Sequence, residues 1–323
     1  MNHYNLWLDL FDNLNFISQL AFIFTGCTIR NNIIITDAYN IQSKHINLLN
    51  EKLLKKNFRH ITKLGIVNRN IKDIAYMKRL KILSIKSREI INASIEGLDL
   101  VELYVAYNKK LNNISFMKNL KILHAVDVCG IDNYSIKNLD LIELDVTDNP
   151  KITNISFMKN LKRLTAAGDS GITNSSIRGL NLIELNASNN KNITNVSFMT
   201  NLKRLIAAGT CGVTNSSMEW LDLYELNVSF NENITNVSFM KNLKILYAID
   251  RSGINDNGIR GLDLIMLIAI GNSKITDVTH MKHLKILHAM GYDCGISDAG
   301  IVGLDMEELN SHVNNKITKK LNQ

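Results

Sequence analysis

The chain has 323 residues, of which 46% are hydrophobic and 21% charged, with 17 glycines and a single proline. This composition excludes a disordered chain, which has too few apolar residues for a core, and it excludes a collagen-like or proline-rich fibre. No stretch approaches the ~20 apolar residues of a membrane-spanning helix. We therefore expect a folded, soluble protein that does not enter a membrane.

The net charge of +7 is concentrated in the first third of the chain. Residues 1–110 hold 16 Lys and Arg against 9 Asp and Glu, whereas residues 111–323 hold 21 of each. A nucleic-acid groove along the whole chain would need basic residues repeated along one face. The balanced charge of the later residues argues against a nucleic-acid partner.

Cysteine usage indicates a reducing compartment. Four cysteines in a chain of this length do not resemble a disulfide scaffold; they are Cys27, Cys129, Cys211 and Cys294. The apolar run from Phe16 to Phe24 could be a secretory signal, but Asp9 and Asp12 precede it without any Lys or Arg, which is the wrong charge for a signal peptide. We expect a cytoplasmic protein, with secretion as the minor alternative.

Residues 1–57 form a segment without the repeated pattern that follows. Apolar residues recur at helical spacing between Leu6 and Leu20 and again between Ile46 and Leu54. One apolar face of this kind predicts a small helical cap at the N-terminal end of the fold.

A repeat of about 41 residues, made of two alternating segments, fills residues 58–314. One segment reads Leu-Lys-Ile/Arg-Leu and begins at Leu80, Leu120, Leu161, Leu202, Leu243 and Leu284. The other reads Leu-Asp/Asn-Leu-x-Glu-Leu, with Met in place of Glu in the last copy, and begins at Leu98, Leu139, Leu180, Leu221 and Leu262. Alternate positions are apolar, so each segment predicts a short strand with one buried face. One coil cannot bury its own core, and the coils must stack as a solenoid with a parallel sheet.

An asparagine follows the strand in every second coil, and we expect its buried amide to bond the backbone where the chain leaves the sheet. This structural Asn ladder consists of Asn108, Asn149, Asn190, Asn231 and Asn272. The other coils carry Cys or Ser near the same bend, which indicates a packing role and not a chemical one.

The repeated pattern ends before residue 315, and we expect residues 315–323 to form a basic C-terminal tail.

The repeated pattern resembles the leucine-rich repeat. The Asn-bearing coils resemble the internalin-like type, and their partners resemble the cysteine-containing type found in F-box proteins. The resemblance implies an α/β repeat solenoid: a leucine-rich-repeat horseshoe with a parallel β-sheet on the concave face and short turns or 3₁₀ segments on the convex face. The run from Leu10 to Leu14, with Leu20 and Cys27, also resembles an F-box, which implies a ubiquitin-ligase adaptor as partner.

Motifs of catalysis and metal binding are missing from the sequence. It holds no phosphate loop, no Gly-x-Ser-x-Gly and no His-Glu-x-x-His, so we expect no enzyme, no cofactor and no small-molecule substrate. The best metal candidates are His280, His283 and His288. However, His280 takes the slot of Phe116 and His283 that of Asn119, so both should face away from His288, and we predict no metal site.

The outward-facing strand positions are charged in the central coils and apolar in the last coils. In the central coils we expect a charge ladder whose members pair with one another; it consists of Glu143, Arg163, Glu184, Arg204 and Glu225. In the last coils the same positions predict an exposed apolar surface, made of Ile245, Tyr247, Ile249, Met266, Ile268, Ile270, Ile286, His288 and Met290. Exposed apolar patches on a soluble protein usually mark binding sites.

These observations favour a non-enzymatic module that binds a protein partner on its concave face, with the apolar surface as the site. One alternative is an F-box-type substrate receptor of a ubiquitin ligase, in which residues 1–57 recruit the ligase. A second alternative is a secreted adhesin resembling internalins.

Overall fold

The computed structural model describes residues 37–38, 61–66 and 71–318. The chain divides into two compact units, Met1–Leu141 and Ile142–Gln323, and each is described by itself. The F-box-like residues Leu10–Leu14, Leu20 and Cys27 lie outside the described residues, as does nearly all of the predicted helical cap. Within that segment, Asp37 and Ala38 form strand β1, which pairs in parallel with β2.

Unit 1 is a stack of coils whose strands pair in parallel and in chain order. Its described elements are β1 (Asp37–Ala38), β2 (Lys63–Ile66), β3 (Ile82–Ile85), η3 (Asn92–Ile95), β4 (Glu102–Ala106), β5 (Ile122–Val126) and α4 (Asn133–Ile136).

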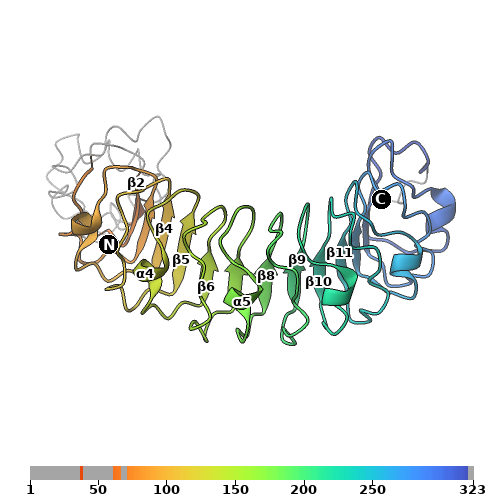
Figure 1. Ribbon diagram of the computed structural model, residues 1–323. Coiled ribbons are helices and arrows are strands. Elements are labelled where there is room, and N and C mark those ends of the chain that lie inside the picture. The colour runs from red at the N-terminus through yellow and green to blue at the C-terminus, as the bar shows by residue number, and fades with distance from the viewer. Residues whose placement is uncertain (1–36, 39–60, 67–70, 319–323) are drawn as a thin grey trace, which may run out of the picture. The chain divides into compact units, whose positions relative to one another are not determined.

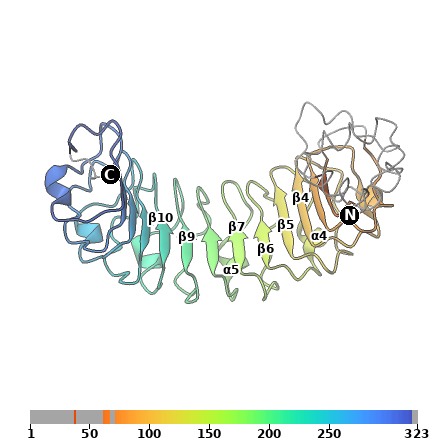
Figure 2. The ribbon, with the colours of Figure 1, turned by 180° about the vertical axis from the view of Figure 1, so that it is seen from behind.

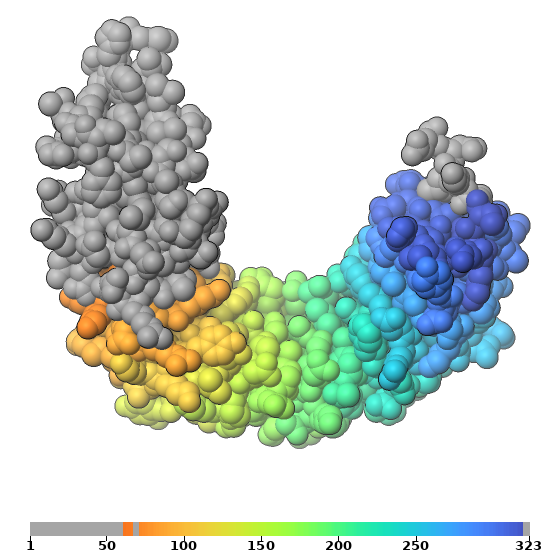
Figure 3. Space-filling model, turned by 90° about the horizontal axis from the view of Figure 1, so that it is seen from above, coloured from red at the N-terminus to blue at the C-terminus, as the bar shows by residue number. Residues whose placement is uncertain are grey.

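Unit 2 repeats the same design with shorter strands, which lie side by side and run in one direction (Figures 1 and 2). Its described elements are β6 (Glu143–Asp145), β7 (Arg163–Thr165), α5 (Asn174–Ile177), β8 (Glu184–Asn186), β9 (Arg204–Ile206), η4 (Asn215–Ser217), β10 (Glu225–Asn227), β11 (Ile245–Tyr247), η5 (Asn257–Ile259), β12 (Met266–Ile268), β13 (Ile286–His288), η6 (Asp298–Ile301) and β14 (Glu308–Asn310). The colours change in chain order along this unit in the space-filling view, because each coil packs on its sequence neighbours (Figure 3).

The core lies behind the sheet and consists of the leucines predicted to point inward. The central residue of nearly every strand is buried, as Leu144, Leu185 and Leu246 show with 1% exposure or less. Stacking of these layers removes apolar surface from water, which is the main stabilising contribution in a solenoid.

Among the described residues, the returning side of every second coil from β3 onward contains a single turn of 3₁₀ or α-helix, which confirms the prediction of short segments there. A buried serine anchors several of these turns to the coil before it: Ser135 Oγ donates to the Asn112 carbonyl at 2.6 Å and Ser176 Oγ to the Thr153 carbonyl at 2.6 Å. Such bonds satisfy backbone groups that have no strand partner.

The coil pattern continues to the end of the described residues. Strand β14 has the same Glu-Leu-Asn sequence as β8 and β10 and pairs with β13. Beyond it, the Thr318 N–H donates to Asp298 Oδ1 at 3.0 Å. The first residues of the predicted tail therefore still belong to the last coil.

Candidate functional site

The open face of the unit 2 sheet is the surface that points away from the core. It is formed by the first and third residues of each strand, since strand side chains alternate between the two faces. These residues are half-buried in most strands, whereas the second is buried. Any partner that binds this sheet contacts those outward positions.

On β6 to β10 the open face is polar except at Ile206 of β9, and its charges pair with one another. Arg163 Nη2 lies 2.6 Å from Glu143 Oε2. Arg204 lies between two carboxylates, with its Nε 2.9 Å from Glu225 Oε1 and its Nη1 4.0 Å from Glu184 Oε2. Such exposed pairs contribute only ~0–1 kcal/mol each, but they leave little unpaired charge for a ligand.

On β11 to β13 the open face is apolar. In-register pairing places Ile245, Met266 and Ile286 in one row and Tyr247, Ile268 and His288 in the next. The pairing continues just past the strand ends, where Ile249, Ile270 and Met290 form a third row. There the Asp250 N–H donates to the Ile270 carbonyl at 2.7 Å and the Gly271 N–H donates to the Met290 carbonyl at 2.9 Å. We call this surface the apolar patch; it consists of Ile245, Tyr247, Ile249, Met266, Ile268, Ile270, Ile286, His288 and Met290.

Ile268 corrects the expectation that every residue of the patch is exposed. Its residue exposure is only 6%, whereas the other members of the patch are half-buried. Ile268 stands in register between Tyr247 and His288, and we attribute its burial to the bulk of these two rings. It therefore forms the floor of the patch and not a contact point.

Two exposed apolar residues that the sequence reasoning missed, Tyr224 and Ile265, lie directly before β10 and β12. Tyr224 is 49% exposed and Ile265 is 39% exposed. The Tyr224 carbonyl accepts from the Ile245 N–H at 3.1 Å, and the Ile265 carbonyl accepts from the Ile286 N–H at 3.1 Å. The same position is apolar in the central coils as well, where Ile142 is 39% exposed and Ile183 is 43% exposed. An apolar residue at this position therefore recurs in alternate coils and does not by itself mark the patch.

Polar side chains bound the patch on both sides. Asn227 of β10 pairs with Tyr247, and Asn310 of β14 pairs with His288. His288 Nε2 lies 2.6 Å from Glu308 Oε1. The apolar width is thus limited to the three strands β11, β12 and β13 among the described residues.

The three histidines considered as metal ligands contact separate partners. His280 Nε2 lies 3.2 Å from the Ile259 carbonyl, and His283 pairs with Asp263, while His288 pairs with Glu308. Among the described residues there is no group of three or more His, Cys, Asp or Glu side chains arranged to hold a metal ion.

The structural Asn ladder bonds the backbone at the strand ends. Asn190 Nδ2 donates to the carbonyls of Ala166 and Ile172 at 2.8 and 3.2 Å, and its Oδ1 accepts from the Asn192 N–H at 2.9 Å. The members of this ladder are fully buried. Their role is therefore to close the bend, and they are not available to a ligand.

Cys129, Cys211 and Cys294 are buried. Loss of hydration on burial raises the pKa of the Cys211 thiol to about 11 and also raises the pKa of Cys294. Neither forms an appreciable amount of thiolate at neutral pH, and the thiolate is the nucleophilic form. These two side chains fill space at the bends, as Ser170 does in an equivalent coil.

The sheet of unit 1 carries an aromatic contact that the sequence reasoning did not find. The rings of Tyr104 and His124 lie in register on β4 and β5, with centroids 4.6 Å apart and a tilt of 54°. Tyr104 Oη donates to Glu102 Oε2 at 2.8 Å. This pair occupies the same outward position as Tyr247 in unit 2.

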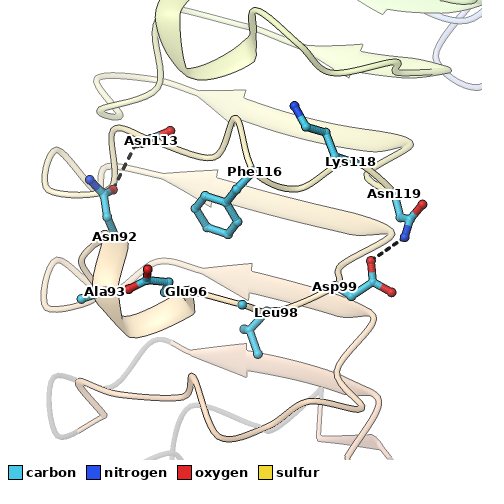
Figure 4. Close-up of a pocket in the computed structure, with 10 residues that line it drawn as sticks. Asn92, Ala93, Glu96, Leu98, Asp99, Asn113, Phe116, Lys118 and Asn119 are labelled. Atoms are coloured by element: carbon cyan, nitrogen blue, oxygen red, sulfur yellow. Dashed lines mark hydrogen bonds between the residues drawn. The ribbon is translucent and has the colours of Figure 1, made fainter.

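A groove of about 810 Å³ lies on the returning side of unit 1, and Phe116 lines it (Figure 4). Its polar walls are bonded to each other: Asn92 Oδ1 accepts from the Asn113 N–H at 3.1 Å, and Asn119 Nδ2 donates to Asp99 Oδ1 at 2.7 Å. Hydrogen bonds from Lys81 and Asn119 lower the pKa of Asp99. A smaller groove of about 330 Å³ beside Phe198 repeats this feature in unit 2, so we interpret both as gaps between coils.

The fold is that of a leucine-rich-repeat solenoid, with parallel strands on one side of each coil and short 3₁₀ turns on the other. An internalin (inlF) from Listeria monocytogenes is similar, with a TM-score of 0.51 and 21% identity over 80% of each chain. At this identity the similarity shows the fold alone.

Two further structures are less similar. Rad7, in the yeast complex of Rad7 and Elc1, has a TM-score of 0.47 and 16% identity, covering 88% of this chain and 90% of that chain. TLR13, from its complex with ssRNA13, has a TM-score of 0.39 and 15% identity, covering 80% of this chain and 54% of that chain.

No protein-family model and no curated protein sequence matches the chain. Among the described residues, no helix has the length and apolar character needed to span a bilayer.

Proposed function

We propose that this chain is a non-enzymatic protein-interaction module that binds a protein partner on the apolar patch of β11 to β13. Leucine-rich repeats typically serve as protein-binding modules. The observation that carries the proposal is the contrast on one sheet: β6 to β10 present paired charges, whereas β11 to β13 present an apolar grid bounded by polar strands.

The physical reason is the cost of leaving apolar side chains in water. Contiguous apolar patches are uncommon on soluble monomers unless they bind something. Aromatic and Met side chains, here Tyr247 and Met290, are enriched where interfaces are buried. We take these two residues as anchors of the interface.

We further propose a cytoplasmic location. Support comes from the cysteines, because the described thiols Cys129, Cys211 and Cys294 are buried in separate coils and contribute no disulfide staple to the fold. Small secreted domains commonly depend on such staples.

The test is a photo-crosslinking amino acid placed at Tyr247 in the full chain and incubated with lysate of its native cells. Position 165 on β7 is the matched control, since Thr165 occupies the corresponding outward strand position. We expect one protein to crosslink at 247 and not at 165.

The double change Tyr247→Asp and Met290→Asp should abolish binding of the protein that crosslinks at position 247. The thermal midpoint measured by circular dichroism should stay nearly unchanged. The matched double change is Thr165→Asp with Asn186→Asp, which should leave binding intact. Binding that survives the first pair but is lost with the second would place the site on the polar strands and refute the proposal.

A further inference from the structure

The strands of unit 2 end in a row of residues with positive φ, which we call the rim. Its members are Asp148, Gly168, Asn189, Gly209, Phe230, Asp250, Gly271, Gly291 and Val313, with φ between 52° and 95°. Gly, Asn and Asp adopt this conformation readily, whereas a bulky or β-branched side chain there is an outlier.

Phe230 and Val313 are the outliers of the described rim, and they flank the apolar patch. Phe230 has φ 58° and is 54% exposed, and Val313 has φ 59° and is 38% exposed. The Phe230 N–H donates to the Ile249 carbonyl at 3.1 Å, which brings its backbone to the edge of the patch. Backbone strain of this kind tends to persist at functional sites.

The central coils show what the rim residue does when the repeat is regular. Asp148 Oδ1 accepts from the Asp169 N–H at 2.9 Å in the next coil. Asn189 Oδ1 accepts from the Thr210 N–H at 3.1 Å in the same way. The rim side chain thus caps one backbone donor of its neighbour.

This cap is lost at the patch. Phe230 and Gly271 replace Asp148 and Asn189 in the corresponding coils, and neither side chain can accept a hydrogen bond. Among the described residues no acceptor contacts the N–H of Arg251 or of Tyr292, the positions that correspond to Asp169 and Thr210. Arg251 is exposed, and Tyr292 is 71% exposed, so both uncapped donors belong to exposed residues beside the apolar patch.

Gly291 leaves space for an approaching chain. A Cβ added there would meet only the backbone of Gly271, at 3.5 Å, without any covering side chain. At Gly168, by contrast, the side chain of Asp148 occupies that place. Glycine without a covering side chain permits close approach of another backbone.

We propose that the rim at Phe230, Arg251 and Tyr292 is the second half of the binding site and holds an extended peptide segment of the partner. An apolar side chain of this segment packs on Phe230, and its backbone carbonyls accept from the N–H groups of Arg251 and Tyr292. This inference rests on the proposed function and adds the chemistry of the partner: an apolar segment with free backbone acceptors, not a helix, whose carbonyls are already bonded.

The test restores the regular repeat. Phe230→Asn recreates the residue found at Asn189, and Tyr107→Asn is the matched control, because Tyr107 also has a positive φ, of 56°, and is 49% exposed, but lies in unit 1. Both changes relieve backbone strain, so each should raise the thermal midpoint by about 2–4 °C.

The probe is a set of peptides selected on the full chain from a phage-displayed library of random dodecapeptides, with binding measured by fluorescence anisotropy. We expect Phe230→Asn to weaken binding at least tenfold and Tyr107→Asn to leave it unchanged. Bound peptide should also slow hydrogen exchange at the amides of Arg251 and Tyr292, and not at Asp169 or Thr210.

Three results would overturn the inference: no selected peptide depends on Phe230, both Asn variants weaken binding equally, or the bound peptides become helical by circular dichroism. If the double change at Tyr247 and Met290 abolishes partner binding but Phe230→Asn does not, the proposed function stands. That result refutes only the inference that the rim is part of the binding site. Insensitivity to all of these changes would refute both.

Discussion

Strands β6 to β10 and strands β11 to β13 share one sheet in unit 2 but differ on its open face. Their inward residues are alike, since Leu185 and Leu246 are equally buried. Outward, the first region pairs Arg163 and Arg204 with carboxylates, whereas the second presents Tyr247 and its apolar neighbours. The repeat therefore specifies the fold through one face of each strand and leaves the other face free to vary.

The largest effect expected is on the core, where the two regions should behave alike. Leu185→Ala and Leu246→Ala should each lower the free energy of unfolding by roughly 2–5 kcal/mol. Leu309→Ala should cost less, because Leu309 in β14 is only half-buried. Urea unfolding followed by circular dichroism measures all three. Equal losses at Leu185 and Leu309 would show that the last coil is covered as well as the central ones.

The structural Asn ladder should give the next largest effect, again in both regions. Asn190→Ala and Asn272→Ala each leave buried carbonyls without a donor, which should cost about 1–3 kcal/mol. The same urea titration measures it, and Asn189→Ala at the exposed rim is the control with a smaller expected loss. A neutral Asn272→Ala would mean that water replaces the amide there.

The charge ladder should contribute little to stability. Arg163→Ala removes the pair with Glu143 and should change the free energy of unfolding by less than about 1 kcal/mol. Any loss should shrink at high salt, because salt screens exposed charges. Unfolding at low and high ionic strength checks this, with partner binding expected to stay unchanged. A large, salt-independent loss would show that the Arg163 stem packs against the sheet.

The smallest effect expected is on the loss of stability at low pH. Hydrogen bonds from Lys203 and Asn242 lower the pKa of Asp222 below its ordinary 3.8. A lowered folded pKa contributes stability above the unfolded pKa, and that contribution is lost as the pH falls through the folded pKa. The control is built into the repeat, since Asn181 fills the equivalent place and accepts from Asn201 Nδ2 at 2.6 Å.

We therefore expect Asp222→Asn to reduce slightly the loss of stability between pH 5 and pH 2, as measured by thermal melts. An unchanged or steeper acid response in the variant would contradict the direction of the shift.

The candidate site could be predicted only in part. Strand alternation correctly placed the outward rows, because a two-residue period with Leu at every inward position allows a single register. The exposure of Ile268 was misjudged, because burial on the open face depends on the size of neighbours in adjacent coils. The strained backbone at Phe230 could not be predicted either, since a φ angle is a property of the folded chain. The signal in the sequence was a phenylalanine at the position where the corresponding coils carry Asp148 and Asn189.

The sequence by itself determined the repeat, the inward leucines, the Asn ladder and the location of the apolar outward positions, because these depend on spacing along the chain. Only the tertiary structure decided which of those residues are exposed, which backbone donors at Arg251 and Tyr292 lack a cap, and which rings meet, as Tyr104 and His124 do. These properties depend on contacts between coils about 20 residues apart, and such contacts follow from stacking geometry and not from local sequence.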